Sequence, residues 1–587
     1  MNIMIKKLFR QMLVTQIVSS MTVTLCMLID SIMIGRFLGV DAMSAYGLAS
    51  PLLLVFAAFG SLISAGVQVM CGKTIGAGDR EATNACYTCS VLLAMGITVI
   101  GVGFVFAFLG PLTSLLGAGS PGPDNPVYGL TKDYITGFII GAPAFLCAQI
   151  MVPFMQLQGC RARLVAAVIA MTVSDIVFDL LVVFVFHGGT LGMGLASTLS
   201  YYIAFGIGIG VFLRKDCMFR FRPRLFRGKT CLELASNGLP TVINSISMVL
   251  LVFLLNRMLL SVEGTLAVAA YSVISTVGNI CYCFGSGTGS VAMMLASIFY
   301  ADRDRTSIRS LVQVMTRWAI VLDVVVTAVG LAAAVPLITL FLGGNIAAKS
   351  IAVFGLRLFV LSILPSSVNS TFKNYYQGIN RLGLTELISV LQNFVFPVAF
   401  AFTLSRFLGV TGIWLGFVCG ETATLIAFSV MVWRHHGSFS LSADAYSMLP
   451  PDFGAAADCC FECKVQSVSD AVNASSQICE FCQQREIDRR TAMLIGLSVE
   501  EMTVNIIEHG FTKDKLDHNV DVRLVLEEDC KVIRIRDNCV RFDPTSYLEL
   551  HQSDDPAAHI GLRMVMGMVK EANYVNSLGL NNLSLTF

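Results

Sequence analysis

Charged side chains are scarce in this chain: only 13% of its 587 residues are Asp, Glu, Lys or Arg, while 55% are apolar. Soluble domains carry about 25% charged residues. The scarcity is confined to the chain up to about Trp433, where long apolar blocks alternate with short polar ones. From Cys459 onward the charge density is that of a soluble domain. A wholly soluble protein is therefore excluded, and the net charge of +1, which averages two unlike parts, gives no reason to expect a nucleic-acid partner.

Two further absences narrow the class of protein. No charged start followed by a short apolar run and a small-residue cleavage site is present, so we expect residues 11–36 to form an uncleaved signal-anchor. The segment Arg227–Thr230 resembles the end of a phosphate-binding loop, but Pro223 stands where the glycine five positions before Gly228 is required. An ATP-driven pump of the ABC type is therefore disfavoured.

Twelve apolar blocks are long enough to cross a bilayer as helices, which takes about 20 residues because lipid offers the backbone no hydrogen-bond partners. They lie near residues 11–36, 46–72, 86–116, 131–156, 163–187, 191–214, 232–262, 267–298, 312–342, 351–378, 384–407 and 411–434. The sequence therefore predicts an all-α polytopic membrane protein with 12 transmembrane helices, followed by a soluble domain.

Basic residues gather in every second loop between these blocks. The densest group lies in residues 215–231, whereas residues 117–131 contain no Lys or Arg. Loops rich in Lys and Arg stay in the cytoplasm, so we expect both termini to be cytoplasmic in a multi-pass protein of the plasma membrane, the inner membrane of a bacterium. The basic loop could also bind anionic membrane lipid, but a topology signal is the simpler interpretation.

The membrane part repeats itself at an offset of about 225 residues: Ala45–Gly47 corresponds to Ala270–Ser272, and Gly78–Arg80 corresponds to Ala301–Arg303. Two six-helix lobes in the same orientation are typical of transporters that rock two bundles about a central site. We therefore divide the chain into a first lobe (residues 1–214), a cytoplasmic basic loop (215–231), a second lobe (232–434), a linker (435–458) and a soluble tail (459–587).

Several stretches of the membrane part carry a family resemblance. The stretch from Asp30 to Gly39, the segments 45–51 and 192–198, and the pair Asp175 and Asp179 resemble the multidrug and toxic compound extrusion (MATE) transporters. The resemblance covers residues 1–435 approximately. It implies a secondary active transporter in which inward movement of H⁺ or Na⁺ drives the export of small organic, often cationic, compounds, drugs and other xenobiotics among them.

Carboxylates inside the apolar blocks are the first candidates for function, because a charge at the bilayer centre costs at least about 2.5 kcal/mol and so needs a cavity or a partner. Asp30 lies in the first block, while Asp175 and Asp179 are four residues apart and share one helix face. By resemblance, Asp30, Asp179 and Thr198 fall on the family's cation-binding pocket in the first lobe, and Asp175 stands where members more often have Asn. Glu421 in the last block is the candidate in the second lobe. The alternative is that these groups only join neighbouring helices.

The tail has the alternation of an α+β sandwich. We expect strands at residues 461–468, 520–527 and 531–536, and helices at residues 469–484, 491–509 and 559–569. We expect the linker to lack regular structure because of its Ser, Gly and Pro residues.

Three motifs in the tail resemble the ATP-binding fold shared by histidine kinases, gyrase-type ATPases and anti-sigma-factor kinases, the GHKL group. Glu501 and Asn505 lie on one helix face, Asp537 follows a strand, and Gly561 opens a helix. The resemblance implies that Glu501 activates a nucleophile, that Asn505 holds Mg²⁺, that Asp537 accepts a hydrogen bond from the adenine of ATP, and that Gly561 belongs to the lid over the phosphates.

Two positions depart from that pattern, since Cys539 and His559 stand where the family has glycine, and a side chain there could crowd the nucleotide. The four cysteines at positions 460, 463, 479 and 482 have the spacing of a zinc site. Zinc is not expected, because the first pair falls on a predicted strand and the second on a predicted helix.

The sequence thus predicts a cation-coupled efflux transporter whose cytoplasmic tail regulates it by binding nucleotide or a cytosolic protein. Two alternatives stay open. One is a membrane-bound signalling protein, an anti-sigma-type Ser/Thr kinase or switch with a transporter-like sensor, and the other is a flippase for lipid precursors. We do not expect the chain to be an enzyme, although the tail could retain ATPase or kinase activity.

Overall fold

The computed structural model describes residues 3–587 apart from 123–124, 215–216, 264, 343–345, 452, 456, 512–517, 527–529 and 551–559. Long helices build the membrane part. Those of the first lobe are α1 (Ile3–Met33), α2 (Val40–Gly76), α3 (Arg80–Ala107), α4 (Leu109–Thr113), α5 (Pro126–Leu157), α6 (Arg161–Leu181) and α7 (Gly189–Phe212). Those of the second lobe are α8 (Gly228–Val262), α9 (Thr265–Ala301), α10 (Arg305–Leu342), α11 (Ile346–Leu361), α12 (Ile363–Gly378), α13 (Leu382–Val390), α14 (Phe396–Leu408) and α15 (Val410–His436).

These helices confirm the predicted fold class. Within the described residues, 11 helical segments are long and apolar enough to cross a membrane. The pair α11 and α12 passes the same test together but is bent by 43°, so the number of spans is 12 if the pair is counted as one. The block near residues 351–378 is thus built from two helices rather than one, whereas the block near residues 384–407 is a single continuous span, Leu382–Leu408.

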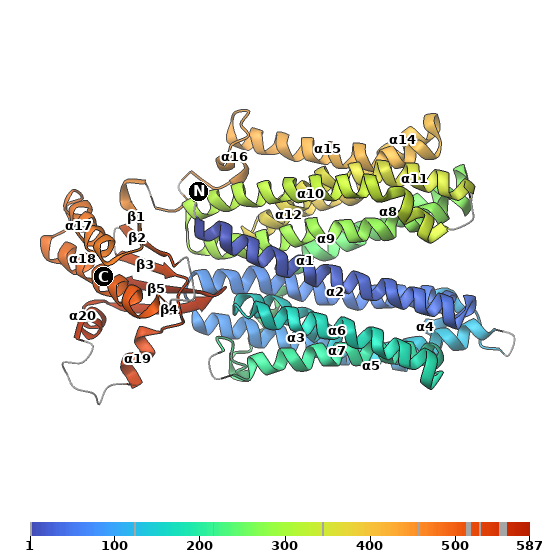
Figure 1. Ribbon diagram of the computed structural model, residues 1–587, viewed down its shortest axis with the longest axis horizontal. Coiled ribbons are helices and arrows are strands. Elements are labelled where there is room, and N and C mark those ends of the chain that lie inside the picture. The colour runs from blue at the N-terminus through green and yellow to red at the C-terminus, as the bar shows by residue number, and fades with distance from the viewer. Residues whose placement is uncertain are drawn as a thin grey trace.

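The membrane helices run along the long axis of the molecule, and the two lobes lie side by side across it (Figure 1). Helices α1 and α2 of the first lobe pack against α9 of the second, and α2 also packs against α8. The tail sits at one end of the bundle, the same end at which the N-terminus lies (Figure 1). We call this the docked end.

The tail is an antiparallel sheet of five strands in the order β1-β2-β3-β5-β4. Its strands are β1 (Cys460–Val465), β2 (Val520–Leu526), β3 (Lys531–Asp537), β4 (Glu571–Ser577) and β5 (Leu580–Thr586). Its helices are α17 (Val468–Gln483), α18 (Arg489–Asn505), α19 (Pro544–Leu550) and α20 (Ile560–Met568). The predicted α+β sandwich is confirmed. The hairpin β4–β5 and the helix α19 are additions that the sequence analysis did not anticipate.

The two faces of this sheet meet different surroundings. Residues such as Val522, Leu524 and Ile535 point to one face and form a hydrophobic core with α17 and α18. Residues that alternate with them, Arg523 and Arg536 among them, point to the other face, which lies against the ends of the membrane helices (Figure 1). The polar face of the sheet is therefore the docking face of the tail.

The linker is more ordered than expected. It contains the short helix α16 (Ala443–Ser447), whose start is capped by Ser442. The hydroxyls of Tyr375 and Tyr376 on α12 donate to the backbone carbonyls of Ser447 and Tyr446, at 3.0 and 3.1 Å. The chain between the last membrane helix and the tail is thus fastened to the second lobe.

Candidate functional site

Three carboxyl groups meet inside the first lobe. Asp30 on α1 and Asp175 and Asp179 on α6 are all buried, and Asp179 is fully enclosed at 0% exposure. The hydroxyl of Ser197 donates to Asp30 Oδ2 at 3.3 Å, and that of Ser200 donates to Asp175 Oδ1 at 3.0 Å. Both serines lie on α7, so three helices build the cluster.

Asp179 is the unusual member of this cluster. Among the described residues no hydrogen-bond donor reaches either of its carboxyl oxygens, or Oδ1 of Asp30. The polar neighbours of Asp179 include the carboxyl groups of Asp30 and Asp175. Like charges at such short range repel, so the group is stable only when a proton or a cation lies between the oxygens. The structure therefore brings the three predicted acids together into one buried cluster.

Thr198, the fourth residue singled out in this lobe, faces elsewhere. Its hydroxyl donates to the backbone carbonyl of Gly137 on α5 at 2.8 Å. The hydroxyl that reaches Asp30 belongs to the preceding residue, Ser197. Thr198 thus fixes α7 against α5 beside the cluster, and Ser197 and Ser200 are polar members of the site that sequence reasoning missed.

A cavity of about 600 Å³ lies between the lobes. Its walls come from α1, α2 and α5 of the first lobe and from most helices of the second, and they are rich in Ser, Asn and Gln side chains. Two charged residues, Glu421 and Lys373, line it on the second-lobe side. A space of this size lined by uncharged polar groups suits a small organic molecule.

Glu421 and Lys373 are linked through an amide. Gln392 Nε2 donates to Glu421 Oε1 at 3.4 Å, and Gln392 Oε1 accepts from Lys373 Nζ at 3.5 Å. Asn369 Nδ2 donates to the other oxygen of Glu421 at 2.9 Å, and Lys373 Nζ donates to Asn244 Oδ1 at 2.5 Å. The predicted carboxyl of the second lobe is therefore held at the cavity wall by a fixed amide network.

Two further ionisable residues of this lobe were not among the predicted site residues. Lys373 lies near the end of its helix, where a lysine ordinarily reaches out to the membrane surface, yet it is buried in the cavity wall. Asp323 on α10 is fully buried, and neither of its oxygens has a hydrogen-bond partner among the described residues. Its position inside an apolar block was the available signal, and Ser367, which lines the cavity, lies beside it.

The lobes are closed against each other at the docked end. A β-carbon on Gly72 would lie 1.8 Å from Ser297 Oγ, and one on Gly76 would lie 2.3 Å from the carbonyl oxygen of Ile298. Ser297 Oγ also donates to the carbonyl of Gln68 at 3.0 Å across the same seam. Helices α2 and α9 thus touch backbone to backbone between the cavity and the tail.

The tail brings three of its four candidate residues, Glu501, Asn505 and Gly561, together in one place. A β-carbon on Gly561 would lie 2.1 Å from Glu501 Oε2, so α20 rests directly on the Glu501 carboxylate of α18. Asn505, one turn further along α18, donates from Nδ2 to the carbonyl of Glu501 at 2.8 Å. The helix face expected to meet the phosphates is therefore covered by Gly561, and a larger residue there would require the Glu501 carboxylate to move.

Asp537 lies at the end of β3, almost entirely buried. Its Oδ1 accepts from the backbone N–H of Cys539 and from Asn581 Nδ2, both at 2.8 Å. Burial raises the pKa of Asp537, and the hydrogen bond from Asn581 opposes that rise. Asn581, on the unanticipated strand β5, is thus the residue that fixes the carboxyl expected to bind adenine.

Of the two positions that depart from the family pattern, the structure describes Cys539. Cys539 is buried against Gly510, whose β-carbon position lies 3.0 Å from Cys539 Cβ, and its Sγ lies 3.6 Å from His518 Nδ1. The position therefore packs inside the tail and retains the backbone N–H that orients Asp537. His559 lies outside the described residues. The buried carboxyl of Asp537 at a strand end fits an adenine nucleotide, while Glu501 is covered by α20 in this structure.

The four cysteines with zinc spacing have separate surroundings. Cys460 and Cys463 lie on β1, and Cys479 and Cys482 lie on α17. Arg523 Nε donates to Cys460 Sγ at 3.4 Å, while Cys482 is part of the hydrophobic core. Within the described residues of the tail, no group of three His, Cys, Asp or Glu side chains is arranged to hold a metal ion.

Comparison with known proteins assigns both parts of the chain. Residues 16–181 and 240–403 match the MatE family, and residues 466–587 match the histidine kinase-like ATPase domain. The multidrug export protein MepA of Staphylococcus saprophyticus subsp. saprophyticus is 23% identical over 401 residues, which are 68% of this chain and 87% of that protein.

Solved structures agree on the fold of the membrane part. An outward-facing multidrug resistance MATE family transporter of the MOP superfamily is similar with a TM-score of 0.69 and 19% identity, over 76% of this chain and 97% of that chain. The Vibrio cholerae MATE transporter VcmN in its bent form is similar with a TM-score of 0.66 and 18% identity, over 72% of this chain and 95% of that chain.

Proposed function

The chain belongs to the MATE family of multidrug efflux transporters, and we propose that it exports small organic compounds by antiport against H⁺ or Na⁺. The observation that supports the coupling is the carboxyl cluster of Asp30, Asp175 and Asp179, in which no donor from the described part of the chain reaches the Asp179 oxygens. The docked end, with both termini, faces the cytoplasm in this proposal, in keeping with the basic loops.

The charge of the carboxyl cluster couples the inward movement of the cation to the outward movement of the exported compound. With a proton or Na⁺ between Asp30 and Asp179, the acids of α1 and α6 can lie together, as they do here. When the cation leaves, repulsion between the ionised carboxyls drives α1 away from α6. Because α1 also packs against α9 of the other lobe, that displacement is passed to the seam between the lobes and to the cavity.

The cavity receives the transported compound. Its amide and hydroxyl walls offer both donors and acceptors, while Glu421 offers a negative charge to a cationic group. Lys373 lies close by, so the second-lobe wall can also meet an acceptor on the same molecule. A compound with a cationic centre and a polar acceptor fits this pair best.

The tail regulates transport by binding an adenine nucleotide in our proposal. Asp537 would hold the adenine amino group, Asn505 would hold Mg²⁺ against the phosphates, and Gly561 would lie beside them. The bound nucleotide supplies charge and, where it is hydrolysed, free energy. Asp537 and Asn581 keep the adenine pocket in one shape, and Glu501 is placed on the helix face from which a nucleophile would be activated.

The kinase alternative keeps one supporting observation, the presence of Glu501 and Asn505 on one face of α18 with Gly561 of α20 against Glu501. Phosphorylation of a cytosolic protein by the full-length chain, lost in Glu501→Ala, would favour it. Transport driven by an ion gradient would not be expected from a sensor.

Reconstituted vesicles test the proposed function. Efflux of a cationic dye is followed under an imposed H⁺ gradient, an imposed Na⁺ gradient or neither, each with and without ATP. Movement driven by one gradient alone identifies the coupling ion and leaves ATP as a regulator. No gradient-driven movement across a panel of cationic, zwitterionic and lipid-linked compounds would contradict antiport.

A further inference from the structure

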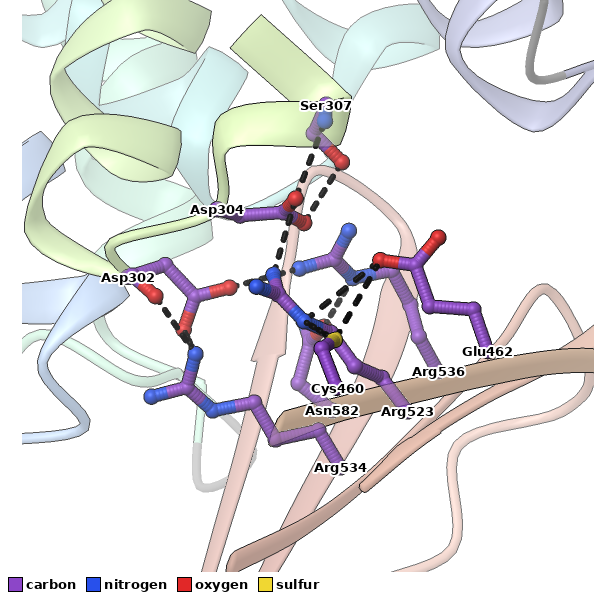
Figure 2. A network of polar contacts seen from close by, with 9 residues as sticks. All are labelled: Asp302, Asp304, Ser307, Cys460, Glu462, Arg523, Arg534, Arg536 and Asn582. Carbon is purple, nitrogen blue, oxygen red and sulfur yellow. Dashed lines mark hydrogen bonds and ion pairs between the residues drawn. The ribbon is translucent and has the colours of Figure 1, made fainter. Parts of the chain in front are cut away.

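The tail is attached to both lobes at once. On the second lobe it holds the turn between α9 and α10, where Asp302 forms ion pairs with Arg534 and Arg536 and Asp304 forms one with Arg523 at 2.8 Å. Figure 2 shows these carboxylates on the turn facing three arginines that project from β2 and β3. The pairs are largely shielded from water, with side-chain exposures of 12% for Arg523 and 6% for Asp304.

Opposite charges face each other in this contact. Burial alone would raise the pKa of Asp304, but Arg523 and Arg536 lower it below its ordinary value, and Asp304 in turn raises the pKa of Arg523. Asp304 also accepts from the backbone N–H of Ser307 at 2.9 Å, which caps the start of α10. The ion pair therefore joins the tail to the first turn of a membrane helix and not to a loose loop.

On the first lobe the tail holds the turn between α2 and α3. Asn573 on β4 donates to the carbonyl of Gly78, and Arg80 Nε donates to the carbonyl of Tyr574 at 3.0 Å. Arg80 also pairs with Asp543 at 3.2 Å. This turn is the repeat counterpart of the α9–α10 turn, so the tail binds equivalent turns in the two lobes. It contacts a basic residue, Arg80, in the first lobe and acidic residues, Asp302 and Asp304, in the second.

A third attachment lies on the turn between α5 and α6. Leu578, in the turn between β4 and β5, donates its N–H to the carbonyl of Leu157 at 2.7 Å, and Arg161 donates to the carbonyl of Leu578 at 2.7 Å. A β-carbon on Gly159 would lie 2.6 Å from the backbone N of Gly579, so the two turns meet backbone to backbone. The hairpin that the sequence analysis did not anticipate is thus the element that reaches the first lobe.

These attachments lie on both sides of the seam between the lobes. Gly76 and Ile298, which meet across the seam, both line a cavity of about 220 Å³ beneath the sheet, together with Arg536. Rocking the lobes apart at this end would move the α2–α3 turn away from the α9–α10 turn. One sheet cannot remain bound to both turns during such a movement.

We propose that the tail is a clamp that keeps the lobes closed at the docked end, and that the transporter opens there only after the sheet has released one lobe. The clamp regulates the transport cycle put forward above and rests on it. The nucleotide residues and the clamp residues are neighbours on the same two strands: Asp537 is held by Asn581, while the adjacent Arg536 donates to Asn582 at 2.7 Å on the opposite face. A ligand at Asp537 would therefore bind next to the residues that form the clamp.

The test measures the distance between the lobes at the docked end in the full-length protein. Fluorophores are attached through unnatural amino acids, because the chain has 18 cysteines, at Ala162 on α6 and Gly383 on α13. Ala162 is exposed, and a side chain at Gly383 meets open space. Single-molecule energy transfer in lipid nanodiscs then gives the fraction of molecules that are open at this end.

Reversing two clamp charges, in the double variant Arg523→Glu and Arg534→Glu, should raise the open fraction by about tenfold or more, since each reversal leaves a buried aspartate beside a like charge. The matched control is the double variant Arg489→Glu and Arg490→Glu, which makes the same charge change on the exposed start of α18. An unchanged open fraction in the clamp variant, or an equal rise in the control, would overturn the clamp.

A second pair of variants guards against damage to the tail itself. Asp302→Asn weakens the clamp from the membrane side, and its control is Asp79→Asn at the repeat-equivalent position, where the side chain caps α3 by accepting from Ala82 N at 2.8 Å. Only Asp302→Asn should open the docked end. Because the distance is measured without substrate or gradient, failure of the clamp and failure of antiport are separate results.

Discussion

Replacing Asn581 by Ala should loosen the tail while leaving the membrane part intact. Asn581 donates to Asp537 Oδ1 at 2.8 Å and accepts from the Tyr574 hydroxyl at 2.6 Å, and all three side chains are buried. The alanine removes an acceptor from Tyr574 and a donor from Asp537. A buried polar group that loses its partner costs about 1–3 kcal/mol, and a typical hydrogen bond contributes about 1 kcal/mol. Tyr574 loses its acceptor, while Asp537 keeps the bond from the Cys539 N–H, so the two together predict a loss of roughly 2–4 kcal/mol. A domain is held folded by only about 5–15 kcal/mol.

Amide hydrogen exchange of the full-length protein measures this loss. A destabilisation of about 2 kcal/mol speeds exchange through opening of β3 and β5 by roughly thirtyfold, since 1.4 kcal/mol is about tenfold. The control is Asn473→Ala on the exposed face of α17, which should leave exchange unchanged. Equal protection of β3 in the Asn581→Ala and Asn473→Ala variants would refute the assignment of Asn581 as the residue that fixes Asp537.

Two further predictions concern the membrane part. Asp179→Asn removes the group that holds the coupling cation in the proposed mechanism. In the unaltered protein, one proton moving down a gradient of two pH units supplies about 2.7 kcal/mol, enough for roughly hundredfold accumulation of the exported compound. In the Asp179→Asn variant this accumulation should fall to background. The control variant Asp133→Asn, at an exposed carboxylate of the same lobe, should retain gradient-driven accumulation. Gradient-driven accumulation in the Asp179→Asn variant would show that Asp179 has no part in the mechanism. Gly76→Ala places a methyl group 2.3 Å from the Ile298 carbonyl, so closure at the docked end should cost about 1–3 kcal/mol and slow export by roughly fivefold to a hundredfold. Gly96→Ala, which meets open space, should transport at the normal rate, and equal export rates in the two variants would contradict a closed seam.

The membrane spans could be predicted from the sequence because length and apolarity alone decide them. The block expected at residues 411–434 is the helix Val410–His436. The bend between α11 and α12 was not predicted, although the sequence turns from apolar in α11 to rich in Ser and Asn in α12. Its position just before Pro365 has a local cause, because proline disrupts the hydrogen bonds of the preceding turn.

The first-lobe acids could be identified because a carboxylate within an apolar block stands out. The hairpin β4–β5 could not be identified with the same ease, because its strands carry polar residues such as Asn573 and Asn582 on the face that docks against the helices. Arg523 and Arg536 alternate with apolar residues as in any half-buried strand. Nothing local in the sequence says that their partners are aspartates on a membrane helix turn more than 200 residues away.

The most direct test of the account is the accumulation of a cationic dye in vesicles that contain the purified chain, with an imposed H⁺ or Na⁺ gradient and no ATP. The account predicts uptake against the dye's own gradient that stops when the ion gradient is collapsed by an ionophore. Uptake that needs ATP and ignores both ion gradients would contradict it.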